Sequence, residues 1–63
     1  MSWFLNEINE AGDVRLCMED GRLLYGHSIG VDTNSYPEGV MAFESDGIVY
    51  HFVDLQIADF IQI

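Results

Sequence analysis

The chain has no lysine and only two arginines, Arg15 and Arg22, against eleven acidic residues, so its formal net charge is −9. Proteins that bind nucleic acids draw much of their affinity from Lys and Arg side chains that neutralise phosphates. The composition therefore argues against direct nucleic-acid binding and favours a partner with a basic surface, and such surfaces are common on nucleic-acid-binding proteins. A simpler interpretation also stays open, in which the acidic residues only keep a small domain soluble and monomeric.

Cysteine and long apolar runs are equally scarce. A single cysteine, Cys17, excludes a disulfide within the chain, and no apolar run is long enough to cross a bilayer. No basic stretch followed by an apolar segment opens the sequence, so we expect a cytoplasmic protein. With 63 residues the chain forms one domain, residues 1–63, whose stability must come from good packing, oligomerisation or a partner.

Turn signals recur at short intervals and separate runs rich in Val, Ile, Leu, Tyr and Phe, which is typical of an all-β meander. Residues 14–18 alternate, with Val14, Leu16 and Met18 on one face, as in an antiparallel strand with one buried side. Asp20-Gly21 then supplies positive-φ positions for a tight hairpin turn.

Later segments continue this pattern. Two glycines, Gly26 and Gly30, predict a bend or bulge in the second strand. The longest loop covers residues 32–39 and contains Pro37, and further strands are predicted over residues 40–44, 48–53 and 58–63. Residues 54–56 are expected to form a short turn or one 3₁₀ step.

The first ten residues allow two interpretations. Ser2 would cap a short helix that is ended by Gly12, or residues 3–9 would form a first strand. The helix is favoured because three successive apolar residues, Trp3, Phe4 and Leu5, break the alternation of a strand.

Residues 14–32 and the outline of residues 47–63 resemble the Sm-like (LSm/Hfq-type) small β-barrel. The matching positions are an Asp-Gly-Arg turn, a glycine four residues later and an apolar-Asp pair: Asp20, Gly21, Arg22, Gly26, Val31 and Asp32. The resemblance implies a mainly β fold, a five-stranded antiparallel small barrel with a short N-terminal helix. SH3-like barrels and other small antiparallel β folds share these turn features.

The RNA-binding residues of the Sm-like family have no counterpart. The family's base-contacting Asn position holds Tyr36 here, and no arginine follows Arg22, although the second family motif needs an Arg-Gly pair. The resemblance therefore implies a fold without the RNA-binding function of the family. RNA binding is the third possibility, after the two functions described below.

Catalytic and metal-binding patterns are weak. Cys17, His27 and His51 match no zinc spacing, and we interpret Cys17 as a small packed side chain and both histidines as strand-surface residues. The acid-rich loop at residues 32–35 lacks the glycine and glutamate of an EF-hand, and no phosphate-binding glycine loop precedes a helix. We expect no enzyme activity, no catalytic residue, no metal and no cofactor.

The sequence thus predicts a non-catalytic acidic interaction module, an inhibitor or adaptor that docks carboxylates on the basic groove of a nucleic-acid-handling protein. The predicted partner-binding residues lie in the long loop and the following hairpin: Asp32, Tyr36, Glu38, Glu44 and Asp46. A second acidic group comprises Glu7, Glu10 and Asp13. The alternative is a homo-oligomeric structural protein that pairs exposed strand edges between copies, especially residues 58–63.

Overall fold

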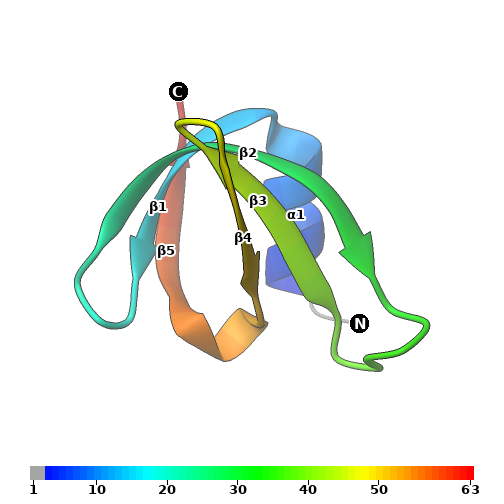
Figure 1. The fold of residues 1–63 in the computed structure, drawn as a ribbon. Helices are drawn as coiled ribbons and strands as arrows, with labels where there is room; N and C mark the ends of the chain where they lie inside the picture. Colours follow the sequence, from blue (N-terminus) through cyan, green and yellow to red (C-terminus); the bar gives the residue numbers. More distant parts are fainter. Residues whose placement is uncertain (1–2) are drawn as a thin grey trace.

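The computed structural model describes residues 3–63, which fold into one short helix and five antiparallel strands of a single sheet (Figure 1). The elements follow the chain in this order: α1 Trp3–Ala11, β1 Asp13–Met18, β2 Leu23–Asp32, β3 Val40–Ser45, β4 Ile48–Phe52, the 3₁₀ turn η1 Asp54–Gln56 and β5 Ile57–Gln62. The strand order in the sheet is β4-β3-β2-β1-β5. The predicted mainly β, five-stranded antiparallel fold with an N-terminal helix is confirmed.

The sheet is not closed, so the barrel itself stays a prediction. Its edge strands are β4 and β5, and the two have no ladder between them in the described part of the chain. The long strand β2 instead joins two halves: its first part pairs with β1 and its second part with β3, and His27 belongs to both ladders. The β2–β3 register shifts between Ser28 and Gly30, where Gly30 has a φ of 151°, so the predicted bulge is confirmed.

The first residues form a helix, and the alternative of a first strand over residues 3–9 is wrong. Gly12, with a φ of 80°, ends the helix in the left-handed conformation that glycine adopts at low cost. The amide of Gln62 donates a hydrogen bond of 2.8 Å to the carbonyl of Ala11 and so satisfies one of the free groups at the helix end. The predicted cap residue, Ser2, lies outside the described residues.

Two Asp-Gly pairs make two different turns. At the β3–β4 turn both residues have positive φ, 54° for Asp46 and 80° for Gly47, as a two-residue type I′ hairpin requires. At the β1–β2 turn only Gly21 is left-handed, with a φ of 93°, and its N–H donates to the carbonyl of Met18 at 2.9 Å. The expectation that Asp20 shares the positive φ is wrong. This loop has three residues, Glu19, Asp20 and Gly21, and in a three-residue hairpin loop only the last residue needs a positive φ.

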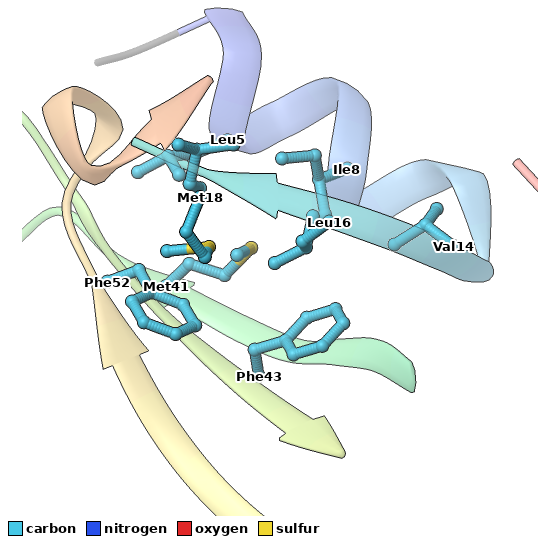
Figure 2. Packing of buried hydrophobic residues seen from close by; sticks show 9 residues of the cluster. Leu5, Ile8, Val14, Leu16, Met18, Met41, Phe43 and Phe52 are labelled. Carbon is cyan, nitrogen blue, oxygen red and sulfur yellow. The ribbon is translucent and has the colours of Figure 1, made fainter. Parts of the chain in front are cut away.

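The core lies between the helix and the curved sheet (Figure 2). Its members are apolar and almost fully buried: Leu5, Ile8, Val14, Leu16, Met18, Met41, Phe43, Phe52 and Ile57. The alternation predicted for residues 14–18 is confirmed, because the even-numbered side chains are buried and the odd-numbered ones half-buried. In the described chain no helix has the length and apolar character needed to span a membrane.

Candidate protein-interaction surface

Carboxylates are the main charged groups on the surface of this domain. None of the eleven acidic side chains is buried, and all but Glu44 and Asp54, which are half-buried, are exposed. One of the two arginines, Arg22, pairs with Asp20 through Nε and Oδ2 at 2.8 Å. Since two arginines face eleven carboxylates, most of the negative charge is not neutralised by basic side chains of the chain itself.

Three of the predicted partner-binding residues lie at the loop between β2 and β3. Asp32 ends β2, and its Oδ1 accepts hydrogen bonds from the main-chain N–H groups of Asn34 at 2.9 Å and Ser35 at 3.4 Å. Tyr36 has 54% of its side chain exposed, and Glu38 is exposed beside it. The Asp32 hydrogen bonds stabilise the start of the loop and leave its tip accessible.

The other two predicted residues lie at the far end of β3. Glu44 points to the outer face of the sheet, opposite His27 of β2, and the Glu44 Oε1–His27 Nε2 distance is 3.4 Å. The other ring nitrogen, Nδ1, lies 3.8 Å from Oδ1 of Asp13. Asp46 is exposed in the β3–β4 turn. The two ring nitrogens of His27 therefore each lie within 4 Å of a carboxylate oxygen.

The five predicted residues form two groups and not one cluster. The β2–β3 loop lies at the same end of the molecule as the β1–β2 turn and η1, whereas the β3–β4 turn lies at the opposite end (Figure 1). The six residues of β3 lie between Glu38 and Asp46 and separate these two by roughly 20 Å. The N-terminal acids are exposed too: Glu7 and Glu10 lie on α1, and Asp13 begins β1. A partner that contacts both groups needs an extended complementary surface.

The β1–β2 turn is the best-defined electrostatic feature. Asp20 accepts a hydrogen bond from the main-chain N–H of Arg22 at 3.0 Å and one from the Arg22 guanidinium at 2.8 Å. The main-chain hydrogen bond, followed by the side-chain bond and the positive charge of Arg22, lowers the pKa of Asp20. Asp20 therefore keeps its negative charge further into the acid range than an ordinary aspartate.

Residues around η1 form a surface that the sequence did not reveal. Leu55 has 86% of its side chain exposed, the highest value among the large apolar residues of the described chain. It borders two hollows, one of about 370 Å³ with Glu38, Val53 and Asp54, and one of about 200 Å³ beside the β1–β2 turn. The sequence contains one hint of this surface: Leu55 stands between the polar residues Asp54 and Gln56 in a short turn, and such a turn does not require a buried side chain.

Metal ligands are not gathered in one place. Among residues 3–63, no group of three or more His, Cys, Asp or Glu side chains has an arrangement that would hold an ion. Cys17 is a free, half-buried thiol on β1, His27 is half-buried on β2 and His51 is exposed on β4.

Comparison of the chain with protein-family profiles, with curated proteins and with solved structures gave no match. The resemblance to Sm-like and SH3-like barrels accordingly stays a prediction.

Proposed function

We propose that this protein is a non-catalytic interaction module that docks its acidic surface on a basic surface of another protein. The observation that carries the proposal is the combination of eleven unburied carboxylates with two arginines. Charge of one sign over a small domain accelerates association with an oppositely charged partner and disfavours like-charged ones. The exposed Tyr36 adds an aromatic anchor of the kind that is enriched at interfaces.

The finer proposal is mimicry of a nucleic acid, in which the module acts as an inhibitor or adaptor for a nucleic-acid-handling protein. Carboxylates at the two ends of β3 lie roughly 20 Å apart. Along one nucleic-acid strand this distance corresponds to about six nucleotides, at about 3.4 Å per phosphate along the axis. A basic groove that holds several successive phosphates has the length to contact both groups.

The test is capture of partners from a lysate on the immobilised protein, followed by mass spectrometry and by binding measurements with each purified candidate. We expect basic partners whose affinity falls steeply between low and high salt, because exposed ion pairs are screened. We also expect duplex DNA or RNA to compete with the module for the partner. Binding that is insensitive to salt, or partners without a basic surface, would contradict the proposal.

A second candidate function is assembly of identical copies through strand edges. The observation that favours it is that β4 and β5 are both sheet edges and carry exposed apolar side chains, with Ile61 47% and Ile48 55% exposed. Edge strands with unpaired main-chain groups readily pair with another chain. Sedimentation analysis at micromolar concentration decides this question, since a strict monomer would remove the candidate, and Ile61→Lys should dissociate any assembly.

A further inference from the structure

The turn η1 carries a leucine that is exposed to solvent, and hydrogen bonds fix the main chain of the turn. Gln56 caps the turn, because its Oε1 accepts from the N–H of Val53 at 2.9 Å and its own N–H donates to the Val53 carbonyl at 3.1 Å. The carbonyl of Gln56 in turn accepts from the N–H of Glu19 in the β1–β2 turn at 2.9 Å. Leu55 lies inside this turn with 86% of its side chain exposed, so an apolar group is displayed at a fixed position.

Leu55 forms a wall of two hollows, and each hollow combines apolar and carboxylate groups. The larger one, of about 370 Å³, has Val53 and Leu55 as apolar walls and Glu38 and Asp54 as acidic ones. The smaller one, of about 200 Å³, is lined by residues of η1 and of the β1–β2 turn. Met18 and Glu19 belong to this lining, and so do Asp20 and Arg22, which form an ion pair with each other. Residues of η1 line both hollows, and Glu38 of the β2–β3 loop completes the lining of the larger one.

Such walls match the side chains of lysine and arginine, whose methylene stems pack on apolar groups while the charged ends remain near carboxylates. We propose that Leu55 and the larger hollow beside it are the anchor site for a lysine- or arginine-bearing segment of the partner protein. The inference rests on the proposed function and deepens it, because it names one end of the molecule as the main contact and one kind of segment as its occupant.

Charge selects this occupant over the others. A nucleic acid would bring phosphates against Glu38 and Asp54, and a second copy would bring another net charge of −9. A neutral apolar segment would bury Leu55 but would offer no positive charge to the neighbouring carboxylate of Glu38. A basic segment with interspersed apolar residues satisfies both kinds of wall.

The experiment titrates the full protein with a fluorescent, end-capped peptide of alternating lysine and leucine, Lys-Leu-Lys-Leu-Lys, at low salt. We expect Leu55→Ser to weaken binding about tenfold, as partial loss of one apolar contact predicts. Glu38→Gln should weaken it about two- to fivefold, as loss of one exposed ion pair predicts. Main-chain NMR shifts should concentrate on residues 53–56 and on Glu38.

Matched controls change the same chemistry elsewhere. Asp59→Asn removes one exposed negative charge from β5, and Ile29→Ser removes a 55% exposed side chain from the β2 bulge, so both should leave the affinity within about twofold of the wild-type value. If all four variants bind equally while the wild type still binds in a salt-dependent manner, the anchor site is wrong and the acidic module stands. If the peptide does not bind at all, or a Gln-Leu-Gln-Leu-Gln peptide binds as well, the proposed function fails with it. Self-association that Leu55→Ser abolishes would assign the site to a second copy and overturn the inference.

Discussion

The main chain of Gly26 in β2 lies directly against the main chain of Glu44 in β3. A Cβ atom on Gly26 would overlap the carbonyl oxygen of Glu44 and lie 2.9 Å from its carbonyl carbon, and both are main-chain atoms that cannot rotate away. This contact occurs where β2 passes from its ladder with β1 to its ladder with β3. The bend of the whole sheet therefore depends on the absence of a side chain at this position.

Gly26→Ala should lower the free energy of unfolding by about 2–4 kcal/mol, because the two strands must separate to admit the methyl group. Gly12→Ala is the matched control: its Cβ would meet nothing within 4 Å, but its φ of 80° is strained for alanine. That control should cost only about 1–2 kcal/mol. Urea denaturation measures both, and a Gly26 variant no less stable than the Gly12 variant would refute the close contact.

Acid should remove the contribution of Asp20 to hairpin stability. The folded-state pKa of Asp20 is lowered, so this contribution is present above the unfolded-state pKa and is lost as the pH falls through the folded-state value. NMR titration of the Asp20 carboxyl carbon should give a lower midpoint in the folded protein than in the urea-unfolded chain.

Asp20→Asn should reduce stability slightly at neutral pH, and the difference from the wild type should shrink in acid. Arg22→Gln should move the Asp20 midpoint part of the way back and not entirely, since the main-chain hydrogen bond from residue 22 remains. An Asp20 midpoint that does not differ between folded and unfolded chains would contradict the hydrogen-bonded turn.

Substitution of one aromatic residue should affect mainly stability, and substitution of another should affect mainly partner binding. Phe43 is fully buried, so Phe43→Ala should cost about 3–5 kcal/mol, at least a third of the roughly 3–9 kcal/mol expected for a domain of 63 residues. Tyr36→Ala, at a half-exposed loop position, should leave stability within about 0.5 kcal/mol and weaken partner binding. Thermal unfolding followed by circular dichroism tests the first expectation, and titration with the captured partner tests the second.

Charge reversals at the two ends of β3 should have separable effects. Glu38→Lys places a cation beside Leu55 and should abolish most binding to the basic partner, by about tenfold or more, if the loop end is the main contact. Asp46→Lys makes the same change of charge at the other end, and its positive φ is tolerated less well by lysine, so its folding must be checked first. Equal losses of affinity from two well-folded variants would indicate only a general dependence on net charge.

Much of the fold followed from local pattern. The alternation of side chains between two faces in residues 14–18 identified a strand with one buried face. Three successive apolar residues near the N-terminus correctly favoured a helix over a strand. The glycine of the β2 bulge was also foreseen. These features depend on the nearest few residues, which a single sequence displays directly.

The surface was harder to predict because it depends on which loops meet in space. Five residues close in sequence were expected to act together, yet a straight strand puts Glu38 and Asp46 at opposite ends of the molecule. Conversely, Glu38 and Leu55 are distant in sequence and border one hollow. Nor did the dipeptide Asp-Gly predict its turn type, since the loop length, set by strand register, decides it.

The ladder between β1 and β5 has a consequence for how the chain folds during its synthesis. Arg15 pairs with Ile61, and the Gln62 amide binds the carbonyl of Ala11 across 51 positions of sequence. Since β1 precedes β5 in the chain, β1 leaves the ribosome first, and both of its edges are paired only after β5 has followed. Until then β1 presents an open edge, and the nascent chain relies on its repelling carboxylates to keep such edges from pairing with those of neighbouring chains.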